Sequence, residues 1–241
     1  MPIQPTTFSS SFPDHIDWLY ANRQTAPLRQ VVNMNVMMFT CMFVEGTLEY
    51  VFRRAIRKDV GLDAFADLPS VNSDDRMRLK VDAEIRRING WSGCWSMFST
   101  IFGTKIGDEI AGDTLEAVDV LFSLRGAIIA HGRAANFVTV GPLQPQNNPV
   151  DFEWESGVFS KVDAFIKKKG LPRHMDGEIP EVGWWFSDEM TDYAFEMAVG
   201  MIVEIGLLPS VSANLFWNTD NGKTMDAINA RLNGRLMPTD R

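Results

Sequence analysis

Apolar residues dominate two long stretches of the chain. In residues 31–44 two asparagines and one threonine are the only polar residues, so the pattern predicts a central buried helix over about 28–58. An apolar run of 14 residues is too short to span a bilayer, and no membrane segment is expected. A second strongly apolar stretch predicts a helix over 184–206, with Ser187 as its N-cap.

Four shorter stretches also carry apolar residues at helical spacing. They predict further helices over 75–88, 91–107, 113–130 and 157–169. After residue 133, the sequences FVTV and DFEWE flank a turn rich in Pro and Asn, which predicts a small hairpin or an extended excursion. We therefore expect an all-α fold, a bundle of about five or six helices with a small inserted β-hairpin or extended excursion.

The same pattern divides the chain into three parts. Residues 1–27, rich in Ser, Thr and Pro, predict an irregular N-terminal arm. Residues 28–206 form the predicted helical domain, with the insertion at about 136–156, and residues 207–241 form a C-terminal tail with a short helix. With 241 residues, of which 45% are hydrophobic, the chain can bury a substantial core.

The segment with the most distinctive chemistry is LFSLRGAIIAHGR, residues 121–133. Asp113 suits the N-cap of the helix that leads into it, with Glu116 completing a capping box. Gly132 suits the left-handed position that ends helices, which places His131 at or beside the C-cap. The negative end of the helix dipole favours a protonated imidazole there.

Arg125 lies on the apolar face of this predicted helix, on one stripe with Val118, Phe122 and Ile129. One interpretation is structural: Arg125 pairs with a carboxylate of a neighbouring helix, and His131 caps its own helix. The other is functional: the face opens onto a cleft or interface where Arg125 binds an anion and His131 transfers a proton. Six residues correspond to roughly 120° around an α-helix and 9 Å along it, and this spacing does not decide between the two.

The run LRGAIIAHG, preceded by MFSTIFGTKIGDEIAGDTLEAVDVLFS, resembles the signature helices of the HEPN superfamily. The hallmark of that family is an Arg, four to six intervening residues, and a His that is often followed by Gly. In this chain five residues separate Arg125 from His131, and Gly126 stands where the family most often has a polar Asn. The resemblance covers residues 28–135 at most.

The resemblance implies an all-helical domain that forms a homodimer, with the Arg and His of both protomers lining one cleft. Many members are metal-independent endoribonucleases, some of them toxins or defence effectors, and others are non-catalytic scaffolds. In the ribonuclease hypothesis the substrate is RNA, His131 is the general acid or base, and Arg125 stabilises the phosphorane. Arg133 is a candidate RNA-binding residue, and no metal or cofactor is required.

The charge balance favours a different hypothesis. The chain has 23 Lys and Arg against 31 Asp and Glu, a net charge of −8, and so repels nucleic acid at long range. Together with Gly126, this charge favours a non-catalytic HEPN-like dimer that acts as a scaffold, a regulator or a protein-binding module. The charge also suits a basic partner, such as a neutralising or regulatory protein. The lysines at 167–169 lie at a predicted helix C-terminus, where positive charge is favourable. A third interpretation is a binding module that uses these lysines.

Two further features concern the cellular compartment. Cys41 and Cys94 both lie in apolar helical surroundings, where buried reduced thiols are expected. The N-terminus has no cationic start and no continuous apolar core, so it lacks the pattern of a secretory signal. These features predict a cytoplasmic protein.

Overall fold

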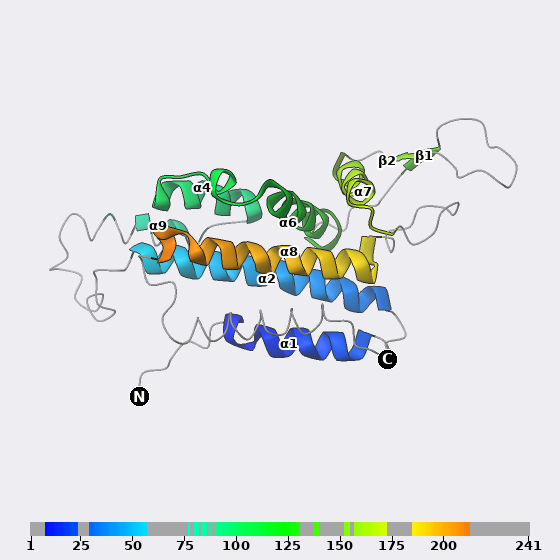
Figure 1. The fold of residues 1–241 in the computed structure, drawn as a ribbon, viewed down its shortest axis with the longest axis horizontal. Coiled ribbons are helices and arrows are strands. Elements are labelled where there is room, and N and C mark those ends of the chain that lie inside the picture. Colours follow the sequence, from blue (N-terminus) through cyan, green and yellow to red (C-terminus); the bar gives the residue numbers. More distant parts are fainter. Residues whose placement is uncertain are drawn as a thin grey trace, which may run out of the picture. The chain divides into compact units, whose positions relative to one another are not determined.

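The computed structural model describes residues 8–23, 29–56, 90–130, 137–139, 152–154, 157–172 and 185–212, together with single positions between 77 and 87. Figure 1 shows the fold. The described residues form an all-α structure with eight α-helices, six of which have seven or more residues. The predicted all-α class is confirmed; the six longer helices include α1, which was not predicted, and do not include the helix expected over 75–88.

Three helices lie close to the bounds expected from the sequence, although α8 begins four residues later than the expected start at 184. α2 spans Arg29–Ile56, α7 spans Gly157–Lys169 and α8 spans Asp188–Leu207. The N-cap of α8 is the predicted Ser187, because its Oγ accepts a hydrogen bond from the Met190 amide at 3.1 Å. The apolar spacing along the chain was therefore sufficient to locate these helices.

Three further helices include two of only four residues, α5 and α9. α4 spans Gly90–Phe102, α5 spans Ile106–Glu109 and α9 spans Pro209–Ser212. The helix predicted over 91–107 is thus divided in two, because the backbone turns at Gly103 with a positive φ of 72°. Most of the predicted helix over 75–88 and the short helix of the C-terminal tail lie outside the described residues.

The prediction of an irregular arm over residues 1–27 is wrong for Phe8–Arg23, which form helix α1. Ile16, Leu19 and Arg23 are buried along one side of this helix. Their spacings of three and four residues place them on one face. The sequence did not indicate this stripe for two reasons. The segment is rich in Ser, Thr and Pro, and only two of the three members of the stripe are apolar.

A two-stranded antiparallel ladder lies within the predicted insertion. β1, Phe137–Thr139, pairs with β2, Phe152–Trp154, with Val138 opposite Glu153. The Pro- and Asn-rich turn that joins the strands lies outside the described residues. Strands of three residues do not support a separate β domain.

The chain divides into two compact units. Unit 1 contains residues 1–13, 42–115 and 199–241, and unit 2 contains residues 14–41 and 116–198. Each unit is therefore assembled from segments that are far apart in the sequence. α2 and α8 each supply residues to both units.

Each unit has aromatic side chains in its core. In unit 1 the ring of Phe52, on α2, lies 6.4 Å from the ring of Phe98 and 6.3 Å from that of Phe102, both on α4. In unit 2 the Phe159 ring of α7 stacks on the Trp185 ring, with centroids 4.7 Å apart and 13° between the ring planes. Burial of such large apolar side chains is the main stabilising contribution in both units.

α2 is the longest helix that the structure describes. Its segment Arg29–Arg53, 25 residues with a mean hydropathy of 1.3, is long and apolar enough by composition to cross a membrane. Half of its most apolar window is buried inside the protein, and the core helix of a soluble protein and a signal sequence near the N-terminus pass the same test. The expected absence of a membrane segment and the cytoplasmic location therefore stay predictions.

Candidate functional site

Arg125 lies where an α-helix changes into a π-helix. α6 spans Gly112–Leu124, and the π-helix η3 continues it over Arg125–Ala130. The segment predicted to be helical up to Ala130 is therefore helical, but its last six residues are not α-helical. The change of helix type begins at the arginine that carries the proposed chemistry.

The start of α6 corrects the predicted cap. The helix begins at Gly112, and the Leu115 amide donates a hydrogen bond to the Ala111 carbonyl at 3.0 Å. Asp113 consequently lies in the first turn of α6 and is not its N-cap. A carboxylate in the first turn still favours the helix, because it faces the positive end of the dipole.

The part of the predicted apolar stripe that lies on α6 is present, and the burial of Ile129, its last member, lies outside what the structure describes. Val118 and Phe122 are buried, with 0% and 7% of their surface exposed, whereas Arg125 is half-buried. The Cζ atom of Arg125 lies 5.8 Å from the centre of the Phe122 ring, within the range of a cation–π contact. The arginine thus extends from an apolar stripe and keeps part of its surface in solvent.

The π-helix changes the geometry expected between positions 125 and 131. Its hydrogen bonds join residues five apart, so each residue turns the helix less than in an α-helix. The α-helical rotation of roughly 120° and rise of 9 Å therefore do not apply to this segment. Gly126 lies in the same turn, and apart from its chain neighbours and the backbone of its own helix no atom lies within 4 Å of the position that its Cβ would take. A larger residue has room there.

His131 and Arg133 lie outside the described residues, which end at Ala130 in this segment. Of the three predicted site residues, the structure places Arg125. The convergence of Arg125 and His131 on one phosphate stays a prediction, as does RNA binding by Arg133.

The lysines of α7 contact carboxylates. Lys161 forms an ion pair with Asp119, and Lys168 forms one with Glu116 at 2.7 Å. Both pairs join α7 to α6, and a further lysine pairs within α7 itself. These partners neutralise much of the charge that a phosphate site at residues 167–169 would use.

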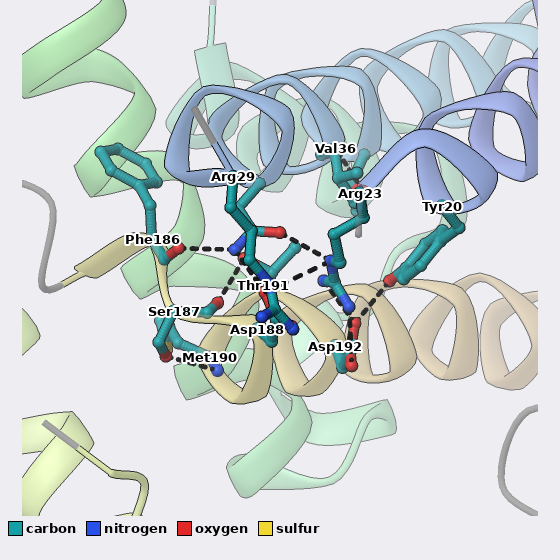
Figure 2. Close-up of polar contacts among 12 residues, drawn as sticks. Tyr20, Arg23, Arg29, Val36, Phe186, Ser187, Asp188, Met190, Thr191 and Asp192 are labelled. Atoms are coloured by element: carbon teal, nitrogen blue, oxygen red, sulfur yellow. Dashed lines mark hydrogen bonds and ion pairs between the residues drawn. The ribbon is translucent and has the colours of Figure 1, made fainter. Parts of the chain in front are cut away.

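A second polar site, missed by the sequence analysis, lies in unit 2 and is shown in Figure 2. Its centre is Arg23, which is 5% exposed. Arg23 donates from Nη2 to Oδ1 of Asp192 at 2.7 Å and from Nη1 to Oδ2 at 3.1 Å. Its Nε donates to Oδ1 of Asn33 at 2.8 Å. The guanidinium also stacks on the Tyr20 ring, and the Tyr20 hydroxyl donates to Asp192 at 2.8 Å.

Asn33 and Asp188 extend these contacts. Asn33 is 1% exposed, and its Nδ2 donates to the Phe186 carbonyl at 2.7 Å and to Oδ1 of Asp188 at 2.8 Å. Asp188 also forms an ion pair with Arg29. The contacts join the end of α1 to the starts of α2 and α8, as Figure 2 shows. We refer to Tyr20, Arg23, Arg29, Asn33, Asp188 and Asp192 as the helix-end network.

The electrostatics of the helix-end network are balanced. Two arginines face two aspartates, and the buried guanidinium and amide both have hydrogen-bond partners. One turn beyond Asp192, burial raises the pKa of Glu196 above its ordinary value, and the charge of Asp192 raises it further. A satisfied network of this kind fixes the arrangement of helix ends, since any displacement would leave a buried charge unpaired.

A sequence signal for the helix-end network exists, although it is short. Arg23 follows Leu19 by four residues, in line with the buried stripe of α1. Asp188 and Asp192 are also four residues apart and so lie on one face of α8. Neither pattern indicates that the two faces meet, because Arg23 and Asp192 are 169 positions apart.

Within the described part of the chain, no group of three or more His, Cys, Asp or Glu side chains could hold a metal ion. No family model, curated protein or solved structure matches the chain. The HEPN resemblance therefore rests on the sequence pattern alone.

Proposed function

We propose that the protein is a metal-independent endoribonuclease of the HEPN type, with a site built around Arg125 and His131. The observation that carries the proposal is the position of Arg125. It is half-buried, it is the first residue of a π-helix, and it follows directly on the predicted apolar stripe. Arg23, at the centre of the helix-end network, is by contrast 5% exposed. A substrate-binding arginine has to reach solvent, and π-helical turns are frequent at functional sites.

In the proposed reaction the 2′-OH of RNA attacks the adjacent phosphorus. The bond to the 5′-oxygen breaks, which leaves a 2′,3′-cyclic phosphate and a 5′-OH. His131 takes the proton of the 2′-OH or gives one to the leaving oxygen. The paired N–H donors of Arg125 hold the non-bridging oxygens and stabilise the charge that develops on them. A homodimer would bring two histidines to one cleft and so provide both an acid and a base.

The net charge of −8 limits how the protein can bind RNA. Long-range attraction cannot supply the affinity, so it has to come from the local contacts of Arg125, His131 and Arg133 with the scissile phosphate and its neighbours. This favours a restricted target and a regulated role, as in a cytoplasmic toxin or defence effector with a neutralising protein partner.

Two features favour a second candidate function, a non-catalytic helical dimer that serves as a scaffold or regulator. Gly126 occupies the position where the family most often has a polar residue, and the chain is acidic. In this alternative Arg125 holds a structural contact, and the acidic surface binds a protein.

RNA cleavage by the purified chain in EDTA tests the ribonuclease proposal. We expect products with 2′,3′-cyclic phosphate ends, and we expect cleavage to be lost in His131→Ala and in Arg125→Ala. Arg53→Ala is the matched control, because Arg53 is also half-buried on a helix but pairs with Glu49 in unit 1. If the parent does not cleave RNA, or if the two site variants cleave as well as the parent, the proposed site is wrong.

Thermal stability separates the two candidate functions. A catalytic arginine can be removed with little loss of folding, so the ribonuclease proposal expects Arg125→Ala to melt close to the parent. The scaffold alternative expects the same variant to unfold or to dissociate. Growth inhibition on expression, relieved by His131→Ala, would support the ribonuclease in the cell.

A further inference from the structure

Three aromatic rings lie in a row at the surface of unit 2. Trp18, on α1, is 63% exposed, which is unusual for so large an apolar side chain. The exposed His15 ring lies 6.5 Å from the Trp18 ring and 4.5 Å from the ring of Phe39, on α2, with centroids as the reference points. The row therefore bridges the two helices of the α1–α2 hairpin.

The positions of these residues on their helices show which side of the hairpin they occupy. On α1, Trp18 lies roughly 160° around the helix from Tyr20, which contacts Asp192 and Phe195 of α8. His15 and Trp18 are therefore on the flank of α1 that faces away from α8.

On α2 the neighbouring stripe is also apolar and accessible. Val31 is 43% exposed, and Met34 and Met38, within about 60° of it on the helix, are half-buried. Phe39 borders this stripe and carries the contact with His15. We refer to His15, Trp18, Val31, Met34, Met38 and Phe39 as the Trp18 surface. Of the apolar members, Trp18 and Val31 are exposed, and Met34, Met38 and Phe39 are half-buried. Exposed apolar side chains are typical of binding sites when they form a patch.

The charges around the Trp18 surface favour a cationic partner over a nucleic acid. Arg23, at the end of α1, and Arg29, at the start of α2, form ion pairs with Asp192 and Asp188 of α8, so these four charges balance one another. Asp17, next to Trp18, is half-buried, and the whole chain carries a net charge of −8. A polyanion would meet a repulsive field here, whereas a cationic segment would be attracted.

We propose that the Trp18 surface binds a cationic amphipathic helix of a partner protein. The apolar side of that helix packs on Val31, Met34 and Met38, since unbranched thioether side chains adapt to the shape of a docked helix. Lys or Arg residues at its edge contact the face of the Trp18 ring through cation–π interactions. The acidic net charge of the chain accelerates the encounter.

This binding site is independent of the proposed ribonuclease site. The Trp18 surface is made of residues of α1 and α2, whereas the ribonuclease proposal uses Arg125, at the start of η3, and the residues that follow it. An experiment that refutes one of the two proposals therefore does not refute the other.

The experiment is a fluorescence anisotropy titration of the full chain with two labelled helical peptides. Both have the same leucine-rich apolar side, and the polar side is Lys and Arg in one peptide and Glu in the other. We expect the basic peptide to bind and the acidic peptide not to bind. Trp18→Ala and Met34→Lys should each weaken binding by about tenfold or more. Leu207→Ala is the matched control, because Leu207 is 68% exposed on α8 in unit 1 and should not affect binding.

Each of the other outcomes overturns the proposal. Equal affinity for both peptides, or no affinity for either, would show that the surface does not select a cationic helix. Displacement of the basic peptide by single-stranded RNA, with loss of RNA binding in Trp18→Ala, would make the surface a base-stacking site. A dimer of the parent that becomes a monomer in Trp18→Ala would assign the surface to a second copy of the chain. The melting temperature of Trp18→Ala should equal that of the parent, since the side chain is mostly in solvent.

Discussion

The guanidinium of Arg23 binds the carboxylate of Asp192 through two hydrogen bonds, of 2.7 Å and 3.1 Å, although the residues are 169 positions apart. Such a two-point contact fixes both the distance and the orientation of the two groups. Because Arg23 ends α1 and Asp192 lies near the start of α8, the contact fixes where α1 lies on unit 2. The helix-end network is therefore the clearest source of structural specificity in that unit.

The first prediction concerns the loss of one partner of this pair. Asp192→Ala should lower the free energy of unfolding by about 2–3 kcal/mol, because the buried Arg23 charge loses its two-point carboxylate contact and keeps only Asp188, whose Oδ1 lies 3.5 Å from Nε. The loss stays below the range for a fully buried pair, since the Asp192 side chain is 43% exposed and water replaces part of the contact. Chemical denaturation of the parent and the variant measures the difference.

The control for this prediction is an ion pair in solvent. Glu84 and Arg87 form a pair at 2.9 Å with side chains that are 60% and 74% exposed. Glu84→Ala should change the free energy of unfolding by less than about 0.5 kcal/mol. Equal losses in Glu84→Ala and Asp192→Ala would show that the helix-end network contributes no more than surface charge.

The second prediction concerns pH. In the folded protein the pKa of Glu196 is raised above its ordinary value of 4.5, first by burial and then by the charge of Asp192. The folded state then binds a proton that the unfolded state has already released, so stability is lost as the pH rises through this window. We expect Glu196→Gln to melt higher than the parent at pH 7, by no more than about 4 °C. The comparison of melting temperatures at pH 4 and pH 7 measures the effect.

Asp192→Asn provides the check on the cause of this shift. In that background the neighbouring charge is absent, so the pH-dependent change in melting temperature that Glu196→Gln produces should become smaller. An advantage of Glu196→Gln that is as large at pH 4 as at pH 7 would argue against ionisation as its origin.

The third prediction compares two glycines. Gly46 lies within α2, and a Cβ there would meet no atom within 4 Å, so Gly46→Ala should stabilise the protein by about 0.5–1 kcal/mol. Gly170 ends α7 with φ +64°, and the next amide donates to the Ile166 carbonyl at 3.1 Å. Gly170→Ala should therefore destabilise the protein by about 1–2 kcal/mol. Opposite shifts of the denaturation midpoint would confirm both assignments, and shifts of the same sign would refute one of them.

The fourth prediction concerns the residue after Arg125. Gly126→Asn restores the polar residue that the HEPN pattern most often has, and the structure has room for the side chain. If the ribonuclease proposal is correct, this variant should cleave RNA faster than the parent, because an amide can hydrogen-bond the substrate or orient Arg125. Gly126→Ala is the matched control and should not gain activity. Equal rates for the two variants would exclude a role for the amide.

Local spacing was enough to predict several helices. The bounds of α7 follow from apolar residues at helical intervals and from Gly170 after the last lysine, and both features lie within one short segment. Ser187 could be identified as the cap of α8 because a capping hydroxyl acts on an amide three residues away. Where the residues that determine a helix lie within one or two turns of each other, the sequence alone is enough to predict the helix.

The candidate site could be predicted only in part. The pattern around Arg125 indicated an arginine on an apolar stripe, and Val118 and Phe122 are indeed buried beside it in the structure. The sequence analysis predicted a single α-helix up to Ala130 and did not predict the change to a π-helix at Arg125. His131 and Arg133 stay sequence-based predictions.

The sequence by itself determined the all-α class, the course of α2, α7 and α8, and the segment that holds the candidate chemistry, because helical periodicity and capping are local. Only the tertiary structure decided that Phe8–Arg23 is a helix and that Arg23 is held by a carboxylate of α8. The physical reason is that a buried charge needs a partner, and the chain finds that partner at Asp192, far along the sequence. No local pattern specifies such a contact.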